Sequence, residues 1–344
     1  MTKVALFDSK NYDLPGFEKY APEKDIEIKY FEAKLCEDTA ELAKGFDCVC
    51  VFVNDELDAA TVEKLYSYGI RLIALRCAGF NNIDTRAAYK KIHIVRVPAY
   101  SPQAVAEHAM AMLLTSVRRI HKAYNRTRDF NFSLSGFTGF ELKDKTVGVI
   151  GTGKIGMQFI EICRGFKMNV IAYDPFPNNK NGINYVSLDE LFTSSDIISL
   201  HCPLTAETEK IINENSISKM KKGVIILNTS RGALINSAAL IDGIKDKKIG
   251  AACLDVYEEE SDIFFEDKSG HIMLDDNLAR LLSMPNVLVT SHQAFLTEEA
   301  LDSIACTTVN NINSFFKNGK CENEICYHCE KLGKCTKERE EKCF

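Results

Sequence analysis

Short apolar runs that alternate with helix-length segments are the feature that most constrains the fold of this chain. In the first hundred residues, four such runs begin at Val4, Cys48, Leu72 and His93. Runs of this length separated by amphipathic segments are typical of buried parallel strands that are joined by helices. This part of the chain therefore predicts an α/β domain with a parallel sheet.

A second and longer series of apolar runs follows a helical linker. Ser101 can cap a helix that tolerates Pro102 in its first turn, and helical periodicity continues over 104–119. Six predicted strands, separated by helical segments, then indicate one complete doubly wound sheet. Helical periodicity returns over 296–316, which we expect to pack in the first domain. The six predicted strands are 146–150, 169–173, 196–200, 224–228, 250–254 and 287–290.

The length of the chain favours two domains, because single cores stop growing near ~250–300 residues and this chain has 344. We expect two Rossmann-like α/β domains, in which a doubly wound parallel-sheet domain is inserted in a smaller flavodoxin-like domain. The expected boundaries are 1–100 and 297–319 for the smaller domain, 101–296 for the inserted one, and 320–344 for a C-terminal extension.

Composition excludes several classes of function. The net charge is −6 and basic residues form no cluster, which argues against nucleic acid as a partner. No apolar run approaches the ~18 residues of a membrane span, and Asp8 interrupts any signal-like start. Eight cysteines are scattered through apolar segments, where we expect them to be reduced. These features predict a cytoplasmic protein without a membrane partner.

A glycine pattern follows the first strand of the second series and opens a helix. Gly151 permits a tight turn, Gly153 lets a pyrophosphate approach the backbone, and Gly156 lets the helix pack closely on the strand. Asp174 lies 18 residues beyond Gly156, where a carboxylate can accept hydrogen bonds from ribose hydroxyls and repel a 2′-phosphate. No arginine follows in 175–177. The pattern predicts NAD as the cofactor rather than NADP, against the alternative of a structural glycine turn.

Three ionisable residues follow strands of the same predicted sheet: Arg231, Glu260 and His292. A planar guanidinium can hold the carboxylate and carbonyl oxygens of a keto acid, and an acid can protonate the developing alkoxide. A carboxylate beside the histidine would keep the ring protonated near neutral pH. Glu258 and Glu259 compete with Glu260 for that position. The alternative for each residue alone is a surface charge or a satisfied core group.

Seven segments together resemble one enzyme family, the D-isomer-specific 2-hydroxyacid dehydrogenases. The resemblance covers about Val4 to Asn318 and is closest to the family members that form D-lactate. The segments that carry it are 76–84, 97–102, 151–156, 201–205, 228–232, 254–258 and 291–295.

The resemblance implies roles for individual residues. Arg231 would bind the substrate, His292 would donate the proton, and Glu260 would be the acidic partner of His292. The backbone N–H groups of Ala78-Gly79 and the hydroxyl of Tyr100 would hold the substrate carboxylate. The resemblance also implies a homodimer built on the cofactor domain. Further residues implied at the cofactor are Lys154, Ile155, Cys202, Pro203, Thr208, Thr229, Ser230 and Asp255.

Substrate choice rests on two aromatic residues. Phe295 resembles the aromatic residue that narrows the pocket in the D-lactate enzymes, and Phe52 can add to it, so the sequence favours pyruvate. One aromatic side chain changes discrimination by only ~1–3 kcal/mol, so phenylpyruvate and 2-ketoisocaproate stay open. A different class of function, a non-catalytic NAD-sensing corepressor, would use the same fold. His201 ends a buried strand, and we expect it to be a structural hydrogen-bonding group.

The last 24 residues depart from the family pattern and are rich in cysteine. One C-x-x-C pair, with His328 and further cysteines nearby, offers enough soft ligands for zinc or an iron–sulfur cluster. The alternative is a flexible, reduced tail. We expect no metal in the active site and expect the core reaction not to need the tail. The candidate ligands are Cys321, Cys326, Cys329 and Cys335, with Cys343 further on.

Overall fold

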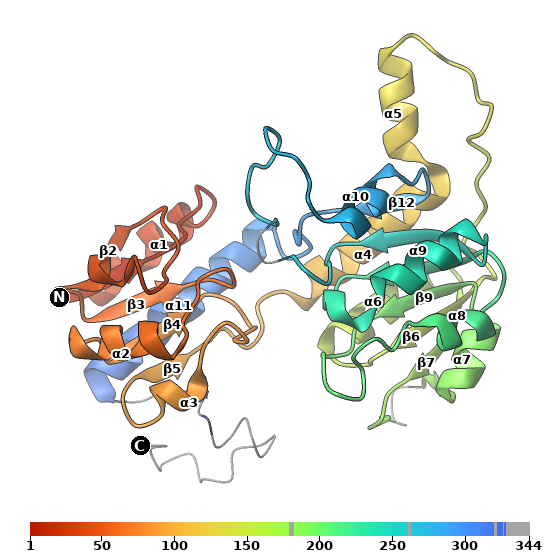
Figure 1. Ribbon diagram of the computed structural model, residues 1–344. Helices are drawn as coiled ribbons and strands as arrows, with labels where there is room; N and C mark the ends of the chain where they lie inside the picture. The colour runs from red at the N-terminus through yellow and green to blue at the C-terminus, as the bar shows by residue number, and fades with distance from the viewer. Residues whose placement is uncertain (179–181, 261–262, 320–321, 326, 328–344) are drawn as a thin grey trace. The chain divides into compact units, whose positions relative to one another are not determined.

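The computed structural model describes residues 1–178, 182–260, 263–319, 322–325 and 327. The chain forms two compact units (Figure 1). Unit 1 consists of Met1–Ser101 together with the described residues from Thr297 on, and unit 2 consists of Pro102–Leu296. Among the described residues, no helix has the length and apolar character that crossing a membrane requires.

Unit 1 contains a six-stranded sheet whose order is β13-β5-β4-β3-β1-β2. The first five strands in sequence are parallel and read 2-1-3-4-5 across the sheet, which is the flavodoxin-like order predicted from the sequence. The strand β2 was not among the predicted runs because it lies at an edge and alternates buried with exposed residues. The strands are β1 (Thr2–Leu6), β2 (Ile26–Tyr30), β3 (Cys48–Val51), β4 (Leu72–Leu75), β5 (His93–Val95) and β13 (Glu324–Ile325).

Three helices of unit 1 begin at side chains that cap their first turn. Asp58 accepts a hydrogen bond from the N–H of Thr61, and Thr297 accepts one from the N–H of Ala300. The long helix α11 ends at Gly319, whose φ of 61° suits a residue without a Cβ. The face of α11 that carries Ala305 and Val309 packs in the core of this unit. The helices are α1 (Leu14–Tyr20), α2 (Ala59–Ser67), α3 (Thr85–Ala88) and α11 (Glu298–Asn318), with 3-10 turns at Pro22–Lys24 and Ala40–Ala43.

The sheet of unit 1 continues past residue 319, where we expected the extension to begin. β13 pairs antiparallel with β5, with Glu324 opposite Val95 and Ile325 opposite Ile94. The side chain of Ile325 is buried. The first described residues of the extension are therefore part of the folded unit.

Unit 2 contains a seven-stranded parallel sheet whose order is β12-β11-β10-β9-β6-β7-β8. The order reverses between β6 and β9, as the doubly wound prediction requires. Only β8 was not predicted, since its two residues are too few to form a pattern. The strands are β6 (Thr146–Ile150), β7 (Asn169–Tyr173), β8 (Asn184–Tyr185), β9 (Ile197–Leu200), β10 (Val224–Asn228), β11 (Ile249–Leu254) and β12 (Val287–Val289).

Helices cover both faces of this sheet. One core joins the sheet to α4 and α6, and the other joins it to α7, α8, α9 and α10. The cores explain why the strands are apolar on both faces. The helices are α4 (Pro102–Arg118), α5 (Ile120–Arg128), α6 (Lys154–Gly165), α7 (Leu188–Ser194), α8 (Glu214–Lys219), α9 (Ser237–Lys245) and α10 (Asp276–Ser283), with a 3-10 turn at Gly232–Leu234.

Candidate active site

The carboxyl ends of the parallel strands of unit 2 share one edge of the sheet. The glycine loop follows β6, Asp174 follows β7, Arg231 lies in the loop after β10, and His292 lies in the loop after β12. Ligands of open α/β sheets bind at this edge, beside the point where the strand order reverses. The topology therefore gathers the predicted residues of this unit at the edge where a ligand is expected.

The glycine loop has the geometry that a dinucleotide phosphate requires. Gly151 has a φ of +95°, and a Cβ built on Gly156 would lie 2.1 Å from the carbonyl oxygen of Gly151. Gly153 is the N-cap of α6 and has no side chain that could cap the first turn. A Cβ on Gly153 would meet nothing within 4 Å, so its backbone is open to a ligand. The first N–H groups of α6 and the helix dipole can thus bind an anion.

The carboxylate of Asp174 is oriented by the loop that it faces. Its Oδ2 accepts hydrogen bonds from the N–H and the hydroxyl of Thr152, at 2.7 and 2.9 Å, and its Oδ1 accepts one from the N–H of Phe176 at 2.9 Å. An ionised carboxylate has about four acceptor positions. Oδ1 therefore keeps capacity for a ribose hydroxyl.

The loops after β9 and β10 are tied together on the same edge. The hydroxyl of Ser230 donates to the carbonyl oxygen of Cys202 at 2.7 Å. Thr208 donates to the carbonyl oxygen of Pro203 at 2.7 Å, so this hydroxyl holds its own loop. Thr229 is buried, and its Oγ1 has no hydrogen-bond partner among the residues that the structure describes. A buried, orphaned hydroxyl at the strand end fits a polar group of a bound dinucleotide.

After the end of β12, the ring of a histidine contacts the carboxylate of a glutamate. The Nδ1 of His292 lies 3.0 Å from the Oε1 of Glu260, and both side chains are partly buried. The other oxygen, Oε2, accepts a hydrogen bond from the N–H of Tyr257 at 3.0 Å. Glu258 points elsewhere, because it forms an ion pair with Lys210 at 3.2 Å. The structure thus places Glu260, rather than Glu258, against the histidine.

Asp255 fixes the turn that carries His292. The Oδ1 of this fully buried carboxylate accepts hydrogen bonds from Thr290 Oγ1 at 2.6 Å and from the N–H of Gln293 at 2.9 Å, and its Oδ2 accepts one from the N–H of Ala294 at 2.8 Å. Burial would raise the pKa of Asp255, but hydrogen bonds, first among them those from His108 and Thr290, hold it below its usual value. The sequence assigned Asp255 only to the cofactor and missed this role.

Arg231 lies on a loop that packs tightly against the loop after β11. The Nδ2 of Asn228 donates to the carbonyl oxygen of Arg231 at 2.8 Å, and the Nη1 of Arg231 donates to the carbonyl oxygen of Ser230 at 2.7 Å. A Cβ on Gly232 would lie 1.9 Å from the carbonyl oxygen of Tyr257, so only glycine fits there. This close approach brings the arginine loop against the segment that leads to Glu260.

His201 is a structural residue in this geometry. Its Nε2 lies 2.8 Å from the Oγ of Ser199, and its ring lies 5.0 Å from that of Phe159. Burial lowers the pKa of His201 to about 4, so the ring is neutral near pH 7. This agrees with the structural role that we expected.

Hydrogen bonds from two side chains fix the backbone of the predicted carboxylate-binding loop of unit 1. The Nη1 of Arg96 donates to the carbonyl oxygen of Ala78 at 2.7 Å, and the thiol of Cys77 lies 3.3 Å from the carbonyl oxygen of Gly79. The C=O and N–H of a trans peptide point in opposite directions. The Arg96 bond therefore turns the N–H of Gly79 away from Arg96. Tyr100 is partly buried.

The two aromatic residues assigned to the substrate pocket are buried in their own units. Phe52 lies under the guanidinium of Arg76, 4.8 Å from ring centre to Cζ, and its N–H donates to Asp55 Oδ2 at 2.6 Å. Phe295 is buried three residues after His292. The ring of Phe265, which the sequence did not single out, lies 5.8 Å from the ring of His292.

Comparison with known proteins decides the family. Residues 110–294, just over half of the chain, match the model described as D-isomer specific 2-hydroxyacid dehydrogenase, NAD binding domain. The chain is 50% identical over 327 residues to the D-lactate dehydrogenase of Escherichia coli K12, covering 94% of this chain and 99% of that protein. The chain belongs to the D-isomer-specific 2-hydroxyacid dehydrogenase family. It is thus an NAD-dependent oxidoreductase, as the sequence predicted.

Solved structures of relatives have the same fold as this dehydrogenase. The apo-structure of D-lactate dehydrogenase from Escherichia coli superposes with a TM-score of 0.87 at 48% identity and covers 94% of this chain and 100% of its own. A structure described as the pyruvate reductase of Chlamydomonas reinhardtii gives 0.87 at 46% identity, with 92% and 96% covered. The predicted fold and cofactor are confirmed at the level of the family.

The cysteines of the C-terminal extension of this dehydrogenase lie outside the described residues. The candidate metal ligands Cys321, Cys326, Cys329 and Cys335 all fall there. In the part of the chain that the structure describes, no group of three or more His, Cys, Asp and Glu side chains is placed to hold a metal ion. A metal site in the tail stays a prediction.

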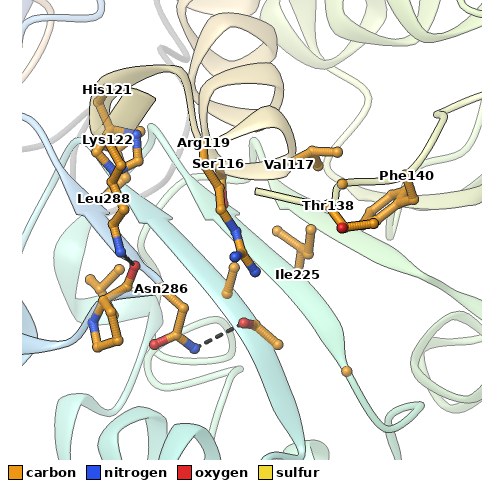
Figure 2. A pocket seen from close by; sticks show the side chains of 16 residues that line it. Ser116, Val117, Arg119, His121, Lys122, Thr138, Phe140, Ile225, Asn286 and Leu288 are labelled. Carbon is orange, nitrogen blue, oxygen red and sulfur yellow. Dashed lines mark hydrogen bonds between the residues drawn. The ribbon is translucent and has the colours of Figure 1, made fainter. Parts of the chain in front are cut away.

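A cavity of about 290 Å³ in unit 2 lies away from the predicted catalytic residues (Figure 2). Its lining includes Gly223, Gly250 and Asn286, which lie at the amino ends of β10, β11 and β12. Arg119 and Lys122 line it from the start of α5. The predicted catalytic residues lie at the carboxyl ends of the strands, so this cavity lies at the opposite edge of the sheet from the predicted active site.

Proposed function

We propose that this dehydrogenase reduces small 2-keto acids with NADH to the D-2-hydroxy acids, with pyruvate as the preferred substrate. The observation that carries the proposal is the pair of His292 and Glu260, 3.0 Å apart at the carboxyl edge of the NAD-binding sheet. The names of the similar proteins from Escherichia coli and Chlamydomonas reinhardtii support the choice of pyruvate and D-lactate.

Different residues of the chain bind the substrate, bind the cofactor and transfer the proton. Arg231 binds the carboxylate and carbonyl oxygens of the keto acid, and the N–H of Gly79 binds the carboxylate. Glu260 holds the Nδ1 of His292, which leaves Nε2 to donate a proton to the carbonyl oxygen. The glycine loop and Asp174 hold NADH, whose nicotinamide supplies the hydride when bound. The reverse reaction needs the same ring neutral, so that it can accept the proton.

The size of the substrate is tested with a panel of keto acids. Phe295, which is buried three residues after His292, favours a small pocket beside the histidine. We expect kcat/KM with NADH to be highest for pyruvate and lower for 2-ketoisocaproate and phenylpyruvate, by about 10- to 100-fold. A preference for either larger acid would overturn the choice of pyruvate while leaving the reaction type intact.

A non-catalytic NAD sensor, the alternative class of function, would not need an oriented acid. Both oxygens of the Glu260 carboxylate are engaged, one by the His292 ring and one by a backbone N–H. Such orientation supports catalysis over sensing. The panel also separates the two classes, because a sensor binds NADH but oxidises it with none of the acids.

We propose a homodimer formed by unit 2. The arm, which we define as α5 and residues 129–140, projects from the rest of this unit (Figure 1). Phe130, Phe132 and Leu134 on the arm are 85%, 70% and 84% exposed. Exposed apolar side chains in such density favour burial against a second copy.

A cytoplasmic location stays a prediction.

The arm gives a test of the dimer. We expect light scattering to give twice the mass of the chain for the wild type, and roughly the mass of one chain for Phe132→Asp at low protein concentration. Phe176→Asp is the matched control, because Phe176 is 88% exposed but lies outside the arm. A wild-type protein of single-chain mass would contradict the dimer.

A further inference from the structure

The start of the cysteine-rich extension contacts β5, which pairs with β4, the strand that leads to the predicted carboxylate-binding loop. β13 pairs with β5, and the carbonyl oxygen of Asn323 accepts a hydrogen bond from the N–H of Arg96 at 3.1 Å. The Nδ1 of His93 lies 2.6 Å from the Oε1 of Glu324, and both side chains are largely buried. These contacts fix the position of β13 on the edge of the sheet.

A pair of asparagines completes the link. The Nδ2 of Asn323 donates to the Oδ1 of Asn311 at 2.8 Å, and the Nδ2 of Asn311 donates to the carbonyl oxygen of Arg96 at 2.9 Å. Asn311 lies on α11 and is only 7% exposed. A buried amide with both ends bonded has one favoured orientation, and removing a partner leaves the others unsatisfied. The backbone of Arg96 is therefore held on its N–H side and on its C=O side.

The side chain of Arg96 carries this constraint to the substrate loop. Its Nη1 donates to the carbonyl oxygen of Ala78 at 2.7 Å, and its guanidinium lies over the ring of Phe80, 5.2 Å from the centroid. The next residue, Val97, donates its N–H to the carbonyl oxygen of Cys77 at 3.2 Å. Arg96 and Val97 thus fix the loop of residues 77–80 through hydrogen bonds to its carbonyl oxygens. The position of Arg96 in turn depends on Asn311 and Asn323.

We propose that Asn311 and Asn323 are positioning residues for the carboxylate of the 2-keto acid, acting through Arg96 on the loop of Ala78 and Gly79. Substrate binding would then require the part of the extension that ends with β13. This inference rests on the proposed function, because it takes the loop to bind the substrate carboxylate. It replaces our expectation that the whole segment after residue 319 is dispensable.

Single substitutions in the full chain test the link. For Asn323→Ala and Asn311→Ala we expect the KM for pyruvate and the inhibition constant of oxamate, an unreactive analogue of pyruvate, to rise together by about 5- to 10-fold. The KM for NADH should stay within twofold, because the cofactor loop lies in unit 2. Asn310→Ala is the matched control, since Asn310 is an exposed neighbour on the same helix.

Two further chains locate the boundary. A chain that ends after Tyr327 keeps β13 and should have the wild-type KM for pyruvate, whereas one that ends after Gly319 should show the same rise as Asn323→Ala. Asn323 directly precedes β13 at the edge of the sheet, so its variant reports on the link even if Asn311→Ala fails to fold. A wild-type KM for pyruvate in Asn323→Ala, or an equal rise in the KM for NADH, would overturn the inference. A wild-type enzyme without pyruvate reductase activity would instead overturn the proposed function.

Discussion

Glu260 is the residue whose charge is most directly testable, because its Oε1 contacts the ring of His292 and its Oε2 is held by the backbone. Glutamine in its place nearly preserves shape and removes the charge. Keto-acid reduction needs the ring turned so that Nε2 can reach the carbonyl oxygen, and the contact of Oε1 with Nδ1 fixes that orientation. In Glu260→Gln the kcat for pyruvate should therefore fall by roughly 10-fold or more, while the KM for NADH stays unchanged.

The variant is compared with Glu259→Gln, which changes an exposed neighbouring carboxylate. We expect the control to keep the wild-type kcat for pyruvate. If the kcat of Glu260→Gln also stays at the wild-type value, the proposed role of Glu260 beside His292 is wrong.

Asp174 is expected to set the choice between NADH and NADPH. Its carboxylate would accept from a ribose hydroxyl and repel a 2′-phosphate. In Asp174→Ala the KM for NADH should rise and the ratio of kcat/KM for NADH over NADPH should fall, by roughly 10-fold or more. The two cofactors are compared at fixed pyruvate. An unchanged ratio would place cofactor discrimination at another residue.

At this scale the sequence predicts residue types better than it predicts contacts. The residue types identified the histidine and a group of three glutamates, and only the resemblance to the family favoured Glu260. The choice among the three glutamates depends physically on how the loop after β11 turns. The structure sends Glu258 to Lys210 and Glu260 to His292. Loop direction is decided by tertiary contacts such as the approach of Gly232 to Tyr257, which no local pattern encodes.

At the scale of elements, His201 at the end of β9 gives a prediction for pH-dependent stability. Burial lowers its pKa to about 4, below its value of about 6.5 in the unfolded chain. Between these values the unfolded chain binds a proton that the folded protein does not. The stability contributed by the neutral ring is therefore complete above pH 6.5 and is lost as the pH falls toward 4.

His201→Gln should remove this part of the pH dependence. Relative to the variant, the wild type should lose about 1.4 kcal/mol of unfolding free energy for each unit of pH between 6.5 and 4. Urea denaturation at several pH values measures the difference, and His271→Gln, at an exposed position, is the control. Parallel curves for the wild type and His201→Gln would contradict the buried, neutral ring.

The elements that the sequence missed share a physical cause. β8 and β13 have two residues each, and β2 is a half-exposed edge strand. None of the three has the continuous apolar run by which the buried strands were recognised, because β8 and β13 are too short and β2 alternates apolar with polar residues. The long buried strands and the helices α4 and α11 follow the predicted ranges closely, because burial on both faces or at helical spacing leaves a clear pattern in the sequence.

At the scale of the whole molecule, the strand orders of both sheets follow from the alternation of strands and helices. Parallel strands need crossovers, and crossovers of one hand leave few possible orders. The same argument gave no information on the arm, whose apolar residues Phe130, Phe132 and Leu134 are separated by polar ones and form no helix pattern. An exposed apolar segment of this kind is buried only when a second molecule binds it. The sequence pattern of one chain does not identify that molecule.

In the proposed reaction, His292 donates the proton as NADH reduces pyruvate to D-lactate. The most direct test incubates the purified protein with pyruvate and NADH, follows NADH oxidation, and separates the product on a chiral column. We predict D-lactate in a 1:1 ratio to NADH oxidised for the wild type, with turnover lowered by about 10³-fold or more in His292→Gln and NADH affinity nearly unchanged. L-lactate as the product, no NADH oxidation by the wild type, or a His292→Gln variant with full turnover would contradict the proposed reaction.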